Sequence, residues 1–228
     1  MVFLFSIYFI VKRKQFNGGT DILTRIKDKE LHIISNGKMP IEKLCEIATD
    51  IHPYLTTIHL REKQKTAREL FQAVQLFINA NIPLSKIIIN DRVDVALVTG
   101  TRGVQLAFHS LEAAVVKKHF SELRVGSSIH SYEEGQKAIV NGVDYVLYGH
   151  VFPSKSKQGK VSKGLEELSR IAQLDIPVIA IGGITPENTV KVIQTGANGI
   201  AVMSGILEAS DPLEAVKAYR NALKDGVG

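Results

Sequence analysis

The sequence predicts a single α/β domain with the (β/α)8 TIM-barrel fold, preceded by an irregular N-terminal extension. From Glu30 onward, short runs rich in Ile and Val alternate with longer segments of helical period, a pattern typical of βαβ units and a parallel sheet. The alternation occurs eight times in about 200 residues, which matches the lower size of such barrels, whereas a doubly wound open sheet rarely needs eight strands. The 228 residues are 45% hydrophobic, which is enough for one large core.

The first four strand and helix pairs are indicated by apolar runs, each followed by a helical stretch. We expect strands over residues 30–35, 57–61, 86–90 and 103–106. The helices are expected from Ile41, from Thr66 to Asn79, in the short segment RVDVALV and in SLEAAVVKKHF. The last of these opens with Ser110, which we interpret as a helix cap.

The last four pairs follow the same pattern. Strands are expected over residues 124–128, 145–149, 177–183 and 199–203. After the fifth strand, Ser131 with Glu134 fits a capping box, and Gly142 fits the end of that helix. A long polar loop separates the sixth strand from a helix around residues 165–172.

Residues 1–29 form the expected extension, and residues 30–228 form the barrel domain. The apolar run from Val2 to Val11 is about half the roughly 20 residues that a membrane span needs, so we expect no stable span. Its charges follow the apolar run, unlike those of a signal peptide. Three interpretations stay open: an interfacial anchor, a tail packed on the domain, or upstream sequence translated from a start codon assigned too early. We favour the last, because regular patterning begins only at Glu30.

Charge and cysteine content exclude some classes of protein. The net charge is +5, but residues 1–29 hold six basic and two acidic residues, so +4 of it lies there and the rest is close to neutral. The barrel therefore lacks the basic stripe that nucleic-acid binding needs. The single cysteine, Cys45, allows no internal disulfide and has no zinc-ligand spacing, and we expect a cytoplasmic protein. A homo-oligomer is compatible with the sequence.

The barrel prediction directs attention to the carboxyl ends of the strands, where such barrels form their active sites. The loops after the seventh and eighth strands often bind phosphate, because glycines let backbone N–H groups approach an anion. We expect a small phosphate ester there rather than glycines that merely make tight turns. The candidate residues of these two loops are Gly182, Gly183, Met203, Ser204 and Gly205.

Three further strand ends carry polar candidates. Arg61 and Lys63 follow the second strand at a spacing of two, so they would share one side of it and could hold an anion; a solvated strand end with a salt bridge is equally compatible. Asn90 and Asp91 end the third strand, where Asp91 could contact Mg²⁺, although a helix N-terminus explains an aspartate as well. Ser127 stands at the end of the fifth strand and is a binding candidate.

Two histidines lie at strand ends, where a proton carrier would be useful. His130 follows the fifth strand, and His150 follows the sixth in YVLYGHVF, behind Gly149, which leaves space for a ligand. Imidazole takes and returns protons near pH 7, although a lone histidine is more often structural. In the polar loop after the sixth strand, Lys155 and Lys157 could close on a second anion; a solvated surface loop is the alternative.

With these residues in view, the chain resembles the thiamine phosphate synthase superfamily, and within it the thiazole tautomerase branch called TenI. The resemblance runs from about Glu30 to Lys224 through HLREK, INDRVDVAL, GSSIHSYEEG, DYVLYGHVFPSKSK, IPVIAIGGITPEN and GANGIAVMSGI. It implies that the glycines of the seventh and eighth loops bind a thiazole phosphate. It also implies that His150, in the GHVF motif where synthases have a GPIF-like one, carries the proton.

The fourth strand separates the two branches further. Synthases typically continue GVHLGQED with a second magnesium ligand, whereas this chain reads GVQLAFHS and has Ser110 at the matching place. The resemblance therefore implies a thiazole tautomerase that aromatises a carboxylated thiazole phosphate through His150, with His130 a second catalytic candidate and with no metal or cofactor. A Mg²⁺-dependent thiamine phosphate synthase and a regulator that binds thiazole phosphate without turnover remain the alternatives.

Overall fold

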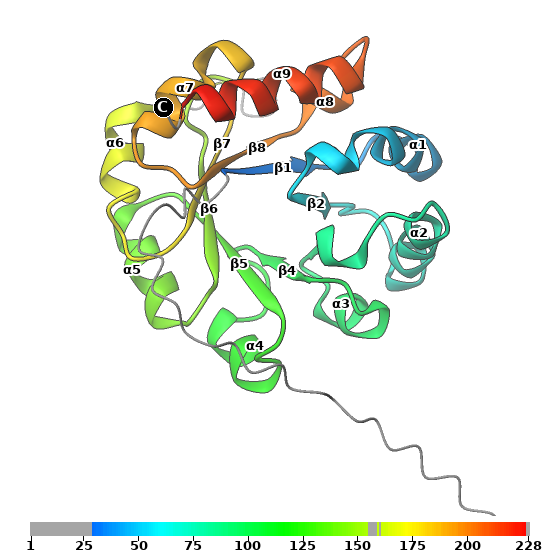
Figure 1. Ribbon diagram of the computed structural model, residues 1–228. Helices are drawn as coiled ribbons and strands as arrows, with labels where there is room; N and C mark the ends of the chain where they lie inside the picture. The colour runs from blue at the N-terminus through cyan, green and yellow to red at the C-terminus, as the bar shows by residue number, and fades with distance from the viewer. Residues whose placement is uncertain (1–28, 155–158, 160, 227–228) are drawn as a thin grey trace, which may run out of the picture.

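The computed structural model describes residues 29–154, 159 and 161–226 and has the predicted (β/α)8 barrel fold (Figure 1). Eight parallel strands pair in chain order, and β1 pairs with β8 to close the barrel. The strands are β1 (Glu30–Ile34), β2 (Thr57–Leu60), β3 (Ile87–Asn90), β4 (Gly103–Leu106), β5 (Arg124–Ile129), β6 (Tyr145–Gly149), β7 (Val178–Ile181) and β8 (Gly199–Val202). The three interpretations of the extension concern residues that lie almost entirely outside the described ones.

Helices surround the barrel on its outside (Figure 1). They are α1 (Ile41–Ile51), α2 (Ala67–Asn79), α3 (Val93–Thr99), α4 (Ala113–His119), α5 (Tyr132–Val140), α6 (Gly164–Ile171), α7 (Pro186–Gln194), α8 (Ser204–Leu207) and α9 (Pro212–Asp225), with two short 3₁₀ turns, η1 (His52–Tyr54) and η2 (Leu84–Lys86). None of the helices in the described part of the chain is long and apolar enough to cross a membrane.

Helix starts show where local sequence decides structure. Thr66 caps α2 in a complete capping box: its hydroxyl accepts from the Glu69 N–H at 3.3 Å, and the Glu69 carboxylate accepts from the Thr66 N–H at 2.7 Å. Ser131 caps α5, but the box is incomplete, because the Glu134 carboxylate accepts from the N–H of His130 instead, at 2.6 Å.

The predicted cap at Ser110 is wrong. Helix α4 begins only at Ala113, and its N-cap residue, Glu112, makes no side-chain cap hydrogen bond. The Ser110 hydroxyl instead accepts from the N–H of Ala107 at 2.8 Å and donates to the carboxylate of Asp91. A tertiary partner at the end of β3 therefore takes the hydroxyl that would otherwise start the helix.

The core has two parts, because successive strand residues point to opposite faces. One face packs against the helices in a large apolar cluster, and the other fills the inside of the barrel, here called the lumen. The lumen holds Ile34, Tyr145, Leu147, Ile179 and Ala201, with Ile181 and Met203 packed against them. This packing makes the barrel interior a filled core rather than a pore.

The amino end of the lumen is polar and carries a partly buried ion pair. Arg124 donates to both carboxylate oxygens of Glu30, at 2.8 and 2.9 Å, and its guanidinium lies over the Tyr145 ring, 4.5 Å from the centroid. Nε2 of His32 lies 2.8 Å from the Glu30 carboxylate, and Nδ1 of His32 lies 3.0 Å from Nε2 of His59. A carboxylate only accepts, so Nε2 of His32 carries its proton. Its Nδ1 then accepts from His59.

Burial and these partners set the pKa values of the network. Burial lowers the pKa of His32 and lowers that of His59 well below its ordinary value, so both rings are neutral near pH 7. Burial opposes ionisation of Glu30, but the hydrogen bonds from His32 and Arg124 and the positive charge of Arg124 outweigh it and lower the Glu30 pKa to about 2. The network therefore consists of one ionised pair and two neutral imidazoles.

Candidate active site at the carboxyl end of the barrel

Two histidines flank one peptide group at the carboxyl ends of β5 and β6. His150 follows β6 directly and is only 9% exposed, whereas His130 follows β5 and is exposed. Nδ1 of His130 lies 2.8 Å from the carbonyl oxygen of Gly149, the residue before His150. Because a carbonyl only accepts, Nδ1 of His130 carries a proton, which leaves Nε2 as the ring nitrogen available for proton exchange. The structure thus brings the two predicted catalytic residues together.

The seventh loop packs tightly against the residues that follow β6. The N–H of Val151 donates to the oxygen of Ile181 at 2.9 Å, and the N–H of Phe152 donates to that of Gly182 at 2.9 Å. Gly182 has φ +103°, and a Cβ added there would stand 2.3 Å from the Cβ of His150. Gly183 has φ +65°, and a Cβ there would stand 2.4 Å from the oxygen of Pro153. Both glycines are therefore required by packing, whatever they bind.

The same loop keeps backbone donors available. Across the described residues, the N–H groups of Gly183 and Ile184 enter no hydrogen bond. In the eighth loop, Ser204 and Gly205 are exposed and begin α8, where the first N–H groups of a helix have no intrahelical partner. The Tyr219 hydroxyl donates to the oxygen of Ile184 at 2.9 Å and would stand 2.3 Å from a Cβ on Gly205, so it joins the two loops.

The ends of β3 and β4 place one carboxylate beside a hydroxyl and an imidazole. Asp91 has φ +65°, its Oδ1 accepts from the Ser110 hydroxyl, and its Oδ2 lies 3.3 Å from Nε2 of His109. Mg²⁺ shared with a diphosphate uses one or two carboxylates. In the described part of the chain, no three His, Cys, Asp or Glu residues group as metal ligands. Asp91 with Ser110 therefore does not match a two-carboxylate magnesium site.

The second strand end differs from the prediction. Strand β2 ends at Leu60, and the residues after it form a turn in which the N–H of Lys65 donates to the oxygen of Glu62 at 3.1 Å. The period of two therefore does not extend to Lys63, which is exposed, whereas Arg61 is half-buried and donates its N–H to Ser35 Oγ at 2.8 Å. The prediction that Arg61 and Lys63 share a strand face is wrong.

On β5 the lumen position belongs to Ser128 and not to Ser127. Arg124 reaches Glu30 across the lumen, and a Cβ on Gly126 would stand 2.3 Å from Oε1 of Gln105. Alternation then directs Ser128 inward, where its hydroxyl accepts from Nε2 of Gln105 at 3.1 Å. Ser127, on the opposite face, points away from the lumen. Counting alternate residues from Arg124 would have selected Ser128.

Other residues at this end have separate outcomes. Asn90 ends β3, and its Oδ1, like Oε1 of Gln105, is buried and unpaired within the described part of the chain. Sequence reasoning missed Gln105, although its polarity in the middle of an apolar strand was a signal. Met203 borders the lumen cluster. Lys155 and Lys157 lie outside the described residues, so the prediction for them stays a prediction.

Comparison with known proteins identifies the family. Residues 31–206 match the family described as TMP-TENI, thiamine monophosphate synthase. The chain belongs to this family. A thiamine-phosphate synthase of Chlorobium luteolum is 41% identical over 182 residues, which cover 75% of this chain and 84% of that protein. One of Pyrococcus furiosus is 35% identical over 175 residues, which cover 76% of this chain and 84% of that protein.

A solved structure agrees with this TMP-TENI membership. The structure of a thiamine phosphate pyrophosphorylase from Pyrococcus furiosus superimposes with a TM-score of 0.74 and 32% identity. The match covers 88% of this chain and 98% of that one. The family match itself runs from the second residue of β1 to α8, so it spans nearly the whole barrel.

Proposed function

We propose that this TMP-TENI protein is a thiazole tautomerase, which converts a non-aromatic carboxylated thiazole phosphate into its aromatic isomer. The observation that carries the proposal is the position of His150 directly after β6, with the His130 ring held on the carbonyl oxygen of the preceding residue, Gly149. A proton transfer between two carbons needs a group that takes and returns a proton near pH 7, which imidazole does. The buried position of His150 also limits exchange of that proton with water.

In the proposed reaction, His150 takes the proton from the ring carbon that bears the carboxylate. The electron pair of the broken C–H bond moves into the ring, and a proton returns from His150 to the exocyclic carbon. No proton is gained or lost overall, and the aromatic ring provides the driving force. His130 is placed to relay a proton through its Nε2, since its Nδ1 is engaged by the Gly149 carbonyl.

The phosphate of the substrate is expected at the seventh and eighth loops. The free N–H groups of Gly183 and Ile184 and those that open α8 are suitable donors for an anion. This contact is remote from the reacting carbons, so it supplies binding energy in the ground state and the transition state alike. Substitution of the histidines should therefore lower kcat more than it changes KM.

A thiamine phosphate synthase is the second candidate, and the names of the relatives favour it. Proteins of that name are 41% and 35% identical to this chain. Such a reaction would use Mg²⁺ and a pyrimidine diphosphate, and Asp91 is the carboxylate available to it here. The Ser110 hydroxyl argues against it. Ser110 donates to Asp91 and stands at the position where the synthase motif GVHLGQED has a second carboxylate.

The deciding experiment follows ring absorbance of the non-aromatic thiazole carboxylate phosphate with the full chain, without metal. His150→Gln should lower kcat by about 10² to 10⁴ fold, the usual contribution of general acid–base catalysis. His130→Gln should lower it less, and His119→Gln, an exposed histidine at the end of α4, serves as the matched control. Equal loss in all three variants would contradict the assigned roles.

Failure of the parent protein to accelerate aromatisation would overturn the tautomerase proposal. The same sample would then receive Mg²⁺, the pyrimidine diphosphate and the aromatic thiazole phosphate. Formation of thiamine phosphate would establish the synthase. Heat of binding with the thiazole phosphate, without any product, would instead establish a regulator.

A further inference from the structure

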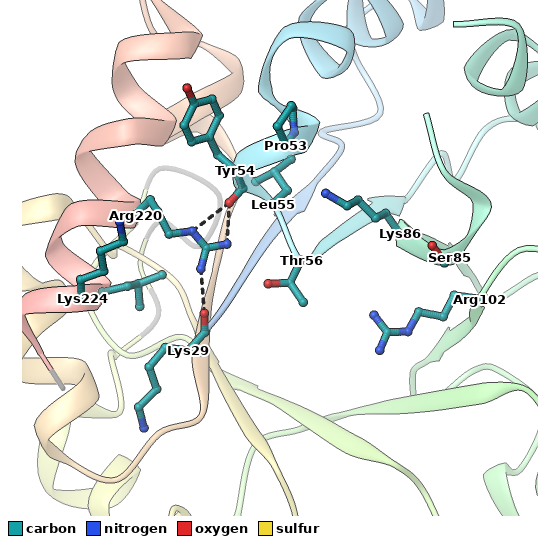
Figure 2. Close-up of a pocket in the computed structure, with 11 residues that line it drawn as sticks. Lys29, Pro53, Tyr54, Leu55, Thr56, Ser85, Lys86, Arg102, Arg220 and Lys224 are labelled. Carbon is teal, nitrogen blue, oxygen red and sulfur yellow. Dashed lines mark hydrogen bonds between the residues drawn. The ribbon is translucent and has the colours of Figure 1, made fainter. Parts of the chain in front are cut away.

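A cavity of about 950 Å³ opens at the amino end of the barrel, opposite the candidate active site. Four of its lining residues, Lys29, Thr56, Lys86 and Arg102, each stand immediately before the first residue of β1, β2, β3 and β4, respectively. Helix α9 contributes Arg220, Leu223 and Lys224. Figure 2 shows Lys86 and Arg102 extending from one wall and Lys29, Arg220 and Lys224 from the opposite one.

The charges on this cavity are all positive. Its lining includes five basic residues and no acidic one. The complete lining consists of Lys29, Pro53, Tyr54, Leu55, Thr56, Ser85, Lys86, Arg102, Arg220, Leu223 and Lys224. Glu30, which follows Lys29, is engaged by Arg124 inside the lumen. Among the described residues, the lining itself therefore holds no carboxylate, and Glu30, whose charge reaches Arg102, is already paired with Arg124.

The side chains of Lys29 and Lys86 have backbone partners that do not neutralise them. Lys29 donates to the oxygen of Ala197 at 2.8 Å, and Lys86 donates to that of His52 at 2.5 Å. Arg220 is held in place by the oxygens of Tyr54 and Lys29, as Figure 2 shows. A carbonyl satisfies a hydrogen bond but carries no net charge. These bonds hold the ammonium groups in place and leave their charge for a ligand.

The side chains of Arg102 and Lys224 have neither a carboxylate nor a backbone carbonyl as a partner among the described residues. Throughout the described part of the chain, neither side chain makes a hydrogen bond or an ion pair. Burial and the charge of Arg124 lower the pKa of Arg102 although the charge of Glu30 acts in the opposite direction, and burial and the charge of Arg220 lower that of Lys86. The like charges of Arg220 and Lys86 thus oppose one another at the cavity, and an anion would relieve that opposition.

We propose that this cavity binds a small organic di- or triphosphate. Two walls of cations suit a ligand with several negative charges, and the Arg102 guanidinium can contact a phosphate through two parallel hydrogen bonds. Pro53, Tyr54, Leu55 and Leu223 add apolar surface for the organic part of the ligand. The volume lies within the range of small-molecule pockets, about 300 to 1,000 Å³.

The site is separate from the proposed catalytic one, so the two are tested independently. Isothermal titration calorimetry with the full chain would use ADP, ATP and inorganic tripolyphosphate, with adenosine as the uncharged probe. We expect one saturable site for ATP, weaker binding of tripolyphosphate because it lacks the organic part, and none for adenosine. Arg102→Gln and Lys224→Gln should each weaken ATP binding about tenfold, as loss of a hydrogen bond to a charged group does.

The matched control is Lys137→Gln on α5, which removes one exposed positive charge away from the cavity. It should leave ATP affinity within about twofold. Tripolyphosphate binding as tightly as ATP would show an inorganic anion site and overturn the organic assignment. Absence of ATP binding, or equal weakening in Lys137→Gln and Arg102→Gln, would overturn the site altogether. Neither result would bear on tautomerase turnover, which is measured without ATP.

Discussion

Replacement of Glu30 by Gln tests the polar network at the amino end of the lumen. The substitution keeps the shape of the side chain but removes the charge that Arg124 binds at 2.8 and 2.9 Å. The Glu30 pKa falls from 4.5 to about 2 in the folded protein. At about 1.4 kcal/mol for each tenfold change in proton affinity, this corresponds to about 3 kcal/mol. A neutral His32 contributes a hydrogen bond but no charge. We therefore expect Glu30→Gln to lower the free energy of unfolding by about 2 to 3 kcal/mol at pH 7.

The pH dependence of this loss of stability follows from the lowering of the Glu30 pKa in the folded protein. Because the pKa is lower in the folded state, the folded protein binds fewer protons than the unfolded one between the two values. The stabilisation is complete above a pH of about 4.5 and is lost as the pH falls towards 2. The difference between parent and variant should therefore shrink to about 1 kcal/mol at pH 3.

Urea unfolding of both proteins at pH 7 and at pH 3, followed by circular dichroism, measures this difference. Glu46→Gln is the control, because Glu46 pairs with Lys43 at 3.0 Å on the surface and should contribute less than about 1 kcal/mol. A loss in Glu30→Gln no larger than in the control would refute the reasoning. A loss that stays constant between pH 7 and pH 3 would show a packing effect rather than a charge effect.

Three further predictions concern local structure. Thr66→Ala should lower the free energy of unfolding by about 1 kcal/mol, measured by urea unfolding, because α2 loses its capping box; an unchanged midpoint would contradict the cap. Gly183→Ala should lower it by more than about 1 kcal/mol, because φ is +65° and the Cβ meets Pro153; a thermal midpoint equal to that of the parent would show that the loop relaxes freely. Ser110→Asp should lower the thermal midpoint without metal, since two carboxylates then meet at Asp91, and Mg²⁺ should restore it in the variant but not raise it in the parent; no response to Mg²⁺ would argue against a latent metal site.

The barrel could be predicted from the sequence because its strands are buried on both faces. Ile87, Ile88 and Ile89 are all fully buried, so β3 appears as a continuous apolar run that local pattern recognises. The positions that failed depend on contacts that local pattern does not contain. The hydroxyl of Ser110 is taken by Asp91 from another strand, and β2 ends before Lys63 because a turn begins at Glu62.

The prediction for Ser127 failed for a different reason, because the sequence alone could have shown which face of β5 this residue occupies. A shift of one residue in a strand moves a side chain from the lumen to the helix face. Taking the last polar residues of a strand as candidates ignores this alternation. Register to the neighbouring strands, here Gly126 with Tyr145 and Gln105, fixes which serine faces inward.

The glycines of the seventh loop show how one local structure can serve two purposes. Their packing against His150 and Pro153 would require glycine even in a barrel that binds no phosphate. The same close approach holds His150 beside the loop whose N–H groups at Gly183 and Ile184 have no hydrogen-bond partner among the described residues. The proposed proton carrier and the proposed anion donors are therefore positioned by one contact, so a substitution at Gly183 should impair both together. Substitution of the histidines, above all His150→Gln, leaves the glycine backbone unchanged and therefore separates the proposed chemistry from phosphate binding.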